Sequence, residues 1–382
     1  MLRTVSLILS LFCAVASFAQ EYVPAELVSV PPRMEVLASE SRGNYECRLI
    51  EYDTDRSERI RAYLLVPDDA EHGRCPALLM LHDHGARFDI GKEKLVRPIS
   101  GGCHGTASHV VPEHVLRSSR QWVDKNFDGV WLADSLASLG YVVLASDALY
   151  WGDRASDEAA RWSELNFGDL DAASSHEDRL LSPSALKDTL KALKVRVYEG
   201  QRRVYEKYSS KGDIWAEKIL RDDIAATRLL ASLPYVDAGN IGAFGFSMGA
   251  HRCWLLTAYC SMIKCGAAVS WMTLKSAADT TSASSLSMVI PQLRAGHDYP
   301  DIAMRLFPKP MLFLSGTDDR LFPKPAVDEA FIRMREIYGT GGVFEDGEPL
   351  LRAEFFEGGH HCGRSVQASV IGFFGRHLKG IF

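Results

Sequence analysis

The sequence predicts an α/β fold, with helices on both faces of a mostly parallel central sheet. Two observations predict it. Compact apolar runs alternate with amphipathic helical segments over most of the chain, which is the pattern of parallel strands joined by crossover helices. In addition, a small-residue turn at 245–249 joins an apolar run, 241–244, to a helical segment, 250–259. The carboxyl ends of such strands form one edge of the sheet, where sites are usually found.

The elements follow in chain order. Two antiparallel strands, 46–51 and 59–66, are predicted on either side of a polar turn. Strands and helices then alternate: strand 76–81, a helix near 129–139, strand 141–145, a helix from Trp215 that closes at Leu233-Pro234, strand 241–244, helix 250–259, strand 311–314 and strand 353–356. This order favours one α/β domain over residues 20–382.

Two segments are longer than the connections that a minimal α/β fold of this type needs. Residues 90–126 are polar and rich in turn residues, and residues 154–210 contain an amphipathic helix that begins at Ser182-Pro183. Both are predicted as insertions that form a lid or rim over the site, so we expect them to determine substrate choice.

The turn Gly245-Phe246-Ser247-Met248-Gly249 has the G-x-S-x-G pattern of a nucleophile elbow. Such a turn is so sharp that bulky side chains do not fit two positions before or after the serine. It leaves the serine hydroxyl alone at the tip and directs the next backbone N–H, that of Met248, at the oxygen of an attacked carbonyl. The pattern also occurs in ordinary Gly/Ser turns that enter a helix, so its weight depends on partner residues.

Suitable partners follow in the order serine, acid, histidine. Asp319 comes after strand 311–314 and is preferred to its neighbour Asp318, and His360 comes after strand 353–356 and is preferred to His361. In this arrangement the histidine takes the proton of Ser247 and returns it to the leaving alcohol, while the carboxylate orients the imidazole. The three residues predict a catalytic triad.

The segment after strand 76–81, His82-Asp83-His84-Gly85-Ala86, is predicted to supply the second oxyanion donor, from the N–H of His84 or of a neighbour. His82 and His84 could instead chelate zinc together with the histidines at 360–361. Ala86 and Arg87 stand where a dinuclear H-x-H-x-D-H pattern needs a carboxylate and a histidine. We therefore expect no metal and no cofactor.

Residues 1–19 have a charged start, a short apolar run and a small-x-small end, which predicts a signal peptide cleaved between Ala19 and Gln20 and an exported, periplasmic or extracellular protein. The formal charge of -6 and the pI near 6.1 give no support for binding of nucleic acid or of a membrane surface. Cleavage removes one of eight cysteines, so complete disulfide pairing is excluded, although a Cys260–Cys265 bond is conceivable. The oligomeric state is left open.

Further residues are candidates for substrate binding. Trp151 and Trp271 each follow a predicted strand, where an indole can stack on a sugar ring or simply cover the core. A uronic acid substrate would favour a cation for a neighbouring carboxylate. The candidates are Arg87, Arg154 and Arg252, with pairing to a structural acid as the alternative for Arg252.

With these motifs in view, the chain resembles an α/β-hydrolase of the dienelactone-hydrolase and acetyl-xylan-esterase-like group from about Tyr45 to the carboxyl terminus. The resemblance rests on the segments 81–85, 221–223, 245–249 and 316–319. It implies the α/β-hydrolase fold and a cofactor-free serine esterase in which Ser247, Asp319 and His360 fill the triad. Dienelactone hydrolases proper differ in having a cysteine nucleophile and a shorter, cytosolic chain.

The function expected from these features is that of an exported carbohydrate esterase. It would remove an acetyl group from a sugar hydroxyl, or cleave the methyl or glycosyl ester of a uronic acid, on an oligo- or polysaccharide. Alternatives are a secreted serine peptidase, a small-molecule carboxylesterase and a non-catalytic glycan-binding protein. The peptidases of this fold usually add a propeller domain, for which this chain is too short.

Overall fold

The computed structural model describes residues 32–54, 58–100, 104–105, 111–169, 181–281, 285–344 and 347–380. The predicted signal peptide lies outside these ranges. Within them, no helix combines the length and the apolar character that crossing a bilayer requires.

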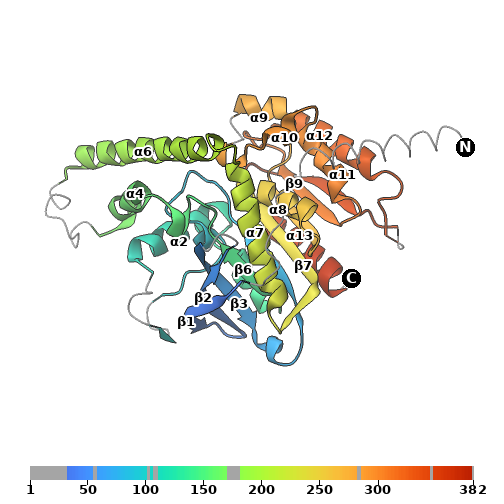
Figure 1. Cartoon of the computed structure of the whole chain (residues 1–382), viewed down its shortest axis with the longest axis horizontal. Coiled ribbons are helices and arrows are strands. Elements are labelled where there is room, and N and C mark those ends of the chain that lie inside the picture. The colour runs from blue at the N-terminus through green and yellow to red at the C-terminus, as the bar shows by residue number, and fades with distance from the viewer. Residues whose placement is uncertain are drawn as a thin grey trace, which may run out of the picture.

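A twisted sheet runs through the described part of the chain, with the strand order β10-β9-β8-β7-β4-β6-β3-β2-β1-β5 (Figure 1). Neighbours from β10 to β6 pair in parallel, and the remaining pairs, from β6 to β5, are antiparallel. The strands are β1 (Met34–Ser41), β2 (Tyr45–Asp53), β3 (Arg59–Pro67), β4 (Cys75–Leu81), β5 (His104–Gly105), β6 (Val142–Ser146), β7 (Val236–Phe246), β8 (Ile263–Val269), β9 (Met311–Gly316) and β10 (Leu351–Phe356).

Helices cover both faces of the sheet. The α-helices are α2 (Glu113–Asn126), α3 (Leu132–Ser138), α4 (Asp157–Phe167), α6 (Pro183–Ser209), α7 (Trp215–Ser232), α8 (Met248–Tyr259), α9 (Lys275–Thr281), α10 (Pro291–Arg294), α11 (Ala303–Leu306), α12 (Lys324–Tyr338) and α13 (Arg364–Phe374). Short turns of 3-10 helix include η2 (Lys92–Lys94).

The core forms two layers because side chains alternate along each strand. In β4, Leu79 and Leu81 pack in the layer that contains residues of α7, α8 and α12, whereas Leu78 and Met80 pack in the layer that contains residues of α3 and α13. These central strands are buried on both faces, which is why they read as continuous apolar runs.

The predicted fold class is confirmed, and most predicted strands agree with the structure to within one or two residues, except at the start of β7. The expectation of a turn-rich segment at 90–126 was wrong for its second half, which forms α2. The helix is amphipathic but polar overall, and its buried face includes Ser118, Ser119 and Asn126 beside Trp122 and Val123, so the segment reads as polar in the sequence.

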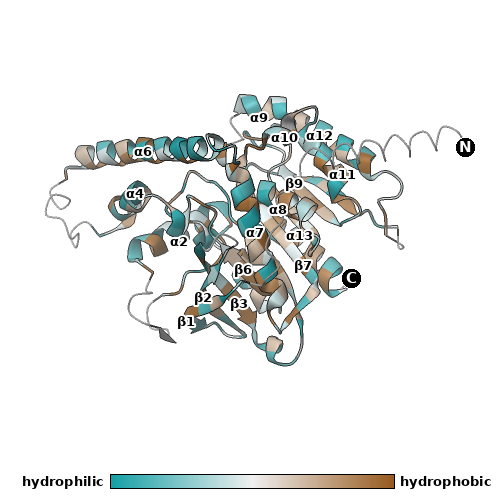
Figure 2. Cartoon of the chain, in the orientation of Figure 1, coloured by the Kyte–Doolittle hydropathy of each residue, from teal (hydrophilic) through white to brown (hydrophobic). Residues whose placement is uncertain are grey.

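The helix predicted to begin at Ser182-Pro183 is α6, and the Ser182 hydroxyl accepts a hydrogen bond from the Ala185 N–H at its first turn. Figure 1 shows α6 extending along one side of the molecule beyond the sheet. Figure 2 shows hydrophilic and hydrophobic residues in bands along it, as expected of a helix with one buried stripe.

The described cysteines are all free and buried. Cys260 and Cys265 are thiols, so the conceivable bond between them is not formed. Burial raises the pKa of the Cys253 thiol to about 12, and it raises that of Cys362 beyond the ordinary range. These thiols are therefore core residues rather than nucleophiles.

Candidate active site

Ser247 lies at the sharp turn between β7 and α8. Its backbone has φ 54° and ψ -124°, a conformation that residues other than glycine rarely adopt. A Cβ atom on Gly245 would lie 1.9 Å from the carbonyl oxygen of Gly249, and one on Gly249 would lie 1.9 Å from that of Leu81. The two glycines are thus required because the turn presses backbone against backbone.

The imidazole of His360 bridges Ser247 and Asp319. Its Nε2 atom lies 2.9 Å from the Ser247 hydroxyl oxygen, and its Nδ1 atom lies 2.7 Å from Oδ2 of Asp319. The Asp319 side chain is fully buried, so its carboxylate is shielded from water. With Nδ1–H donating to the carboxylate, Nε2 is left as the acceptor for the serine proton.

Three further contacts hold this arrangement. The other carboxylate oxygen of Asp319, Oδ1, accepts hydrogen bonds from the backbone N–H groups of Leu321 and Phe322, at 2.9 and 3.2 Å. The Phe322 ring stacks on the His360 ring with an interplanar angle of 17°. The carboxylate and the imidazole are therefore both fixed before a substrate binds.

The neighbours that the sequence left as alternatives lie elsewhere. Asp318 is exposed and lies 3.4 Å from the Thr317 hydroxyl. His361 points to Asp128, with its Nε2 atom 3.1 Å from a carboxylate oxygen. The structure brings Asp319 and His360, rather than these neighbours, to Ser247.

The loop after β4, residues 82–86, lies beside the serine. His84 and Ser247 line the same cavity, and Met248 begins α8 directly after the serine. His84 Nδ1 accepts a hydrogen bond from the Ala86 N–H, and burial lowers the pKa of this histidine to about 3. The backbone N–H groups of His84 and Met248 have no hydrogen-bond acceptor among the residues that the structure describes, as an oxyanion site requires.

The His82 ring is held by hydrogen bonds on both sides. Both ring nitrogens of His82 are occupied: Nδ1–H donates to the Asp83 carbonyl oxygen at 2.9 Å, and Nε2 accepts from the Ala148 N–H at 3.0 Å. Within the described ranges, no three His, Cys, Asp or Glu side chains are grouped so that they could hold a metal ion.

The serine opens into a cavity of about 610 Å³. Trp122 and Asn126 of α2, and Tyr198 and Gln201 of α6, line it, so both segments predicted as insertions contribute to its wall. None of these four residues was predicted from the sequence. For α6 a signal was present, since Tyr198 directly follows Val197 of the buried stripe, and Gln201 lies four residues after Val197, on the same face of the helix. The remaining lining residues are Asp83, His84, Gly85, Ala86, Phe246, Ser247, Ser285, Leu286, Met288, Val289, Leu321, Phe322 and His360.

The predicted substrate-binding tryptophans do not line this cavity. Trp151 is fully buried, and its indole N–H donates to the His84 carbonyl oxygen at 3.2 Å. Trp271 is buried against His251 and Tyr299. The expectation that both rings face the substrate is corrected: they support the site from behind because large aromatic rings at strand ends fill the core.

The three arginines are also turned away from the cavity, each toward an acid. Arg87 pairs with Asp89 at 3.1 Å, Arg154 with Asp222 at 2.9 Å, and Arg252 forms two hydrogen bonds to Asp223, at 2.6 and 3.0 Å. The expectation that they bind a substrate carboxylate is corrected, since a buried guanidinium needs its own counter-ion.

Comparison with known proteins agrees with this geometry. Residues 122–334, more than half of the chain, match the dienelactone hydrolase family. The chain belongs to this family. Its membership makes the protein a hydrolase that acts on ester bonds, in agreement with the resemblance found in the sequence.

Individual relatives are distant. "Putative hydrolase YtaP" of Bacillus subtilis is 23% identical over 318 residues, which cover 82% of this chain and 83% of the relative. Acetyl xylan esterase 1 from Thermoanaerobacterium sp. is similar in structure, with a TM-score of 0.50 and 14% identity, over 95% of this chain and 92% of that chain. A glucuronoyl esterase from Solibacter usitatus has a TM-score of 0.56 and 11% identity, over 95% and 91%. These structures share the α/β-hydrolase fold.

Proposed function

We propose that this member of the dienelactone hydrolase family is an exported serine carboxylesterase that removes ester groups from a polysaccharide through an acyl-enzyme on Ser247. The observation that carries the proposal is the continuous chain of hydrogen bonds from Ser247 through His360 to Asp319 in the wall of a large cavity. Export is supported by the sequence of residues 1–19, which has the charged start, apolar run and small-residue end of a cleaved signal peptide.

The geometry supports a two-step mechanism. The Ser247 hydroxyl attacks the ester carbonyl while His360 Nε2 takes its proton, and the buried Asp319 carboxylate stabilises the imidazolium that results. The oxyanion accepts hydrogen bonds from the N–H groups of Met248 and His84. His360 then protonates the leaving alcohol, and the acyl group stays on Ser247. In the second step a water attacks the acyl carbonyl while His360 takes its proton; the bond from the acyl carbon to the Ser247 oxygen then breaks, and His360 returns the proton to that oxygen as the acid leaves.

The cavity lining supports a neutral ester as the substrate. Its aromatic and aliphatic residues offer stacking surfaces, and Asn126 and Gln201 offer amides for sugar hydroxyls. No lysine or arginine lines the cavity among the described residues, so we favour an acetyl group on a sugar hydroxyl. The methyl ester of a uronic acid is the second candidate, because this fold also occurs in a glucuronoyl esterase. The contributions of α2 and α6 support the proposal that the insertions at 90–126 and 154–210 form the rim.

The test is to incubate the purified protein with acetylated xylan and with methyl-esterified pectin, and to measure the acetate and methanol released. Acetate release that disappears in Ser247→Ala, with the fold intact by circular dichroism, is the expected result. Methanol alone would move the assignment to uronate esters. Ester hydrolysis that survives Ser247→Ala would refute the mechanism, and labelling of Ser247 by a fluorophosphonate separates a working site from a glycan-binding protein.

A further inference from the structure

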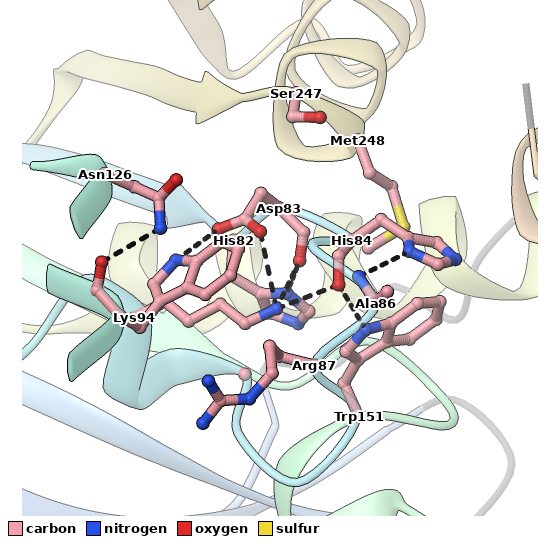
Figure 3. A network of polar contacts seen from close by, with 12 residues as sticks. His82, Asp83, His84, Ala86, Arg87, Lys94, Asn126, Trp151, Ser247 and Met248 are labelled. Carbon is pink, nitrogen blue, oxygen red and sulfur yellow. Dashed lines mark hydrogen bonds and ion pairs between the residues drawn. The ribbon is translucent and has the colours of Figure 1, made fainter. Parts of the chain in front are cut away.

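A buried lysine lies directly behind the loop that carries the proposed oxyanion donor. Lys94, the last residue of η2, has no exposed surface. Its ammonium nitrogen lies 2.8 Å from the carbonyl oxygen of Asp83 and 3.1 Å from that of His84. Figure 3 shows these contacts converging on the Lys94 nitrogen, on the side of the loop away from Ser247. Lys94 itself does not line the cavity.

The two carbonyl contacts determine where the neighbouring N–H groups point. In a trans peptide the C=O and the following N–H point in opposite directions, and both peptides concerned, 83–84 and 84–85, are trans. Because the carbonyls of Asp83 and His84 face Lys94, the N–H groups of His84 and Gly85 face the opposite side. That side is the cavity wall shared with Ser247.

The loop supplies one hydrogen bond to each carbonyl itself: the Arg87 N–H donates to the His84 oxygen at 3.3 Å, and the His82 ring donates to the Asp83 oxygen at 2.9 Å. Gly85 and Ala86 have φ values of 55° and 52°, so two successive residues adopt the left-handed conformation. Donors from outside the loop add further contacts: the Trp151 indole N–H also donates to the His84 oxygen, and the Lys194 ammonium donates to the Ala86 oxygen. Among these donors, Lys94 contacts both the Asp83 and the His84 carbonyl oxygens.

An alternative role for Lys94 is that of a counter-ion for the buried Asp83 carboxylate. The distances favour the carbonyls, since the ammonium lies 3.5 Å from Asp83 Oδ2 and closer to both carbonyl oxygens. The Asp83 carboxylate has a second partner in the Trp122 indole N–H, at 3.2 Å from Oδ1. The three N–H bonds of the ammonium match the three oxygens around it.

We propose that Lys94 is a positioning residue, which holds the His84 and Gly85 N–H groups toward the oxyanion of the reacting ester. Its charge also polarises the two peptides, because a cation at the carbonyl end of a peptide dipole strengthens the donor at the other end. The proposal rests on the serine esterase function proposed above. It extends the oxyanion site from Met248 and His84 to Gly85.

The test uses a pair of variants that differ only at Lys94. Asp83→Asn keeps both carbonyl contacts of the ammonium, and the double variant Asp83→Asn/Lys94→Met removes them without leaving a buried carboxylate unpaired. Both are assayed on an aryl acetate and on its thionoacetate, with rates normalised to the fraction of sites that a fluorophosphonate labels. Sulfur is a poor hydrogen-bond acceptor, so the thionoester depends less on the oxyanion donors.

The expected result is a loss of about tenfold to a hundredfold in kcat for the oxoester, with little change in KM and little change for the thionoester. The ratio of the two rates should therefore be about tenfold to a hundredfold lower in the double variant than in Asp83→Asn. A second control, Asp223→Asn/Arg252→Met, removes another buried ion pair near the elbow and should leave the ratio unchanged.

Equal losses on both esters, or no loss, would overturn the role of Lys94. If the double variant does not fold, Lys94→Gln in the Asp83→Asn background keeps an amide NH₂ donor without the charge and should give an intermediate ratio. A ratio equal to that of Asp83→Asn would again overturn the role. A wild-type protein that hydrolyses neither ester would instead refute the esterase function, and with it this inference.

Discussion

Replacing Asp319 by asparagine tests the triad with almost no change of shape. Oδ1 of Asp319 accepts two backbone N–H groups, from Leu321 and Phe322. In the variant the amide oxygen must occupy this position, because an NH₂ group there would face two donors. The amide NH₂ is then directed at Nδ1 of His360, which forces the imidazole proton onto Nε2. The histidine would donate to Ser247 instead of accepting its proton.

The loss in rate has a size that follows from the geometry. A carboxylate and an imidazolium in contact at 2.7 Å attract each other by about 6 kcal/mol at an effective dielectric constant of about 20. Each factor of ten in rate corresponds to about 1.4 kcal/mol, so we expect kcat to fall by about 10⁴-fold. KM should change little, since Asp319 does not line the cavity.

The assay is hydrolysis of a nitrophenyl acetate by the variant and by wild type, with unfolding in urea as a check on the fold. Asp318→Asn is the matched control, because this exposed neighbour makes no contact with His360 and should keep full activity. A loss of less than about tenfold in Asp319→Asn, in a folded protein, would refute the assignment of the triad and the tautomer argument.

Three further predictions follow from contacts described above. Gly249→Ala should lower the free energy of unfolding by about 3 kcal/mol or more, because the added Cβ would overlap the Leu81 carbonyl. Gly372→Ala in α13, where no atom lies within 4 Å of the added Cβ, should be neutral or stabilising, and urea unfolding of both variants checks this. Burial lowers the pKa of His251 to about 3, so the native state keeps it neutral while the unfolded chain binds a proton below pH 6.5. Stability is therefore lost as the pH falls from 6.5, and His251→Phe should reduce that loss by about 1.4 kcal/mol per pH unit in the same assay; an unchanged slope would contradict it. Tyr198→Ala should raise KM for acetylated oligosaccharides by about fivefold to tenfold and leave kcat and the hydrolysis of nitrophenyl acetate nearly unchanged, which steady-state kinetics would show.

The three triad residues could be predicted from local sequence patterns. Ser247 could be predicted because an elbow needs glycines at fixed positions around the nucleophile, and this need appears directly in the chain. Asp319 could be predicted because it follows β9, which is buried on both faces and therefore reads as a continuous apolar run. His360 follows the edge strand β10, where Glu354 is exposed, and the strand could still be recognised from Ala353, Phe355 and Phe356. Local patterns were sufficient for these three residues, since parallel strands bring their carboxyl ends to one edge.

The residues that hold the substrate could not be predicted in the same way. The tryptophans and arginines that the sequence singled out are buried with partners from other elements, as Arg252 is with Asp223 of α7. Whether such a side chain faces a cavity or a counter-ion depends on which helix packs against it. Local sequence patterns do not show which helix packs against a given side chain.

The sequence by itself determined the α/β fold, the order of its elements and the candidate triad, because these depend on hydropathy periods, glycine positions and strand ends. Only the tertiary structure decided which side chains line the cavity and that Lys94 lies behind the oxyanion loop. The physical reason is that a buried charge is stable only where distant segments supply its acceptors. Lys94 finds them in the backbone of Asp83 and His84, and no local pattern records a contact with a carbonyl oxygen.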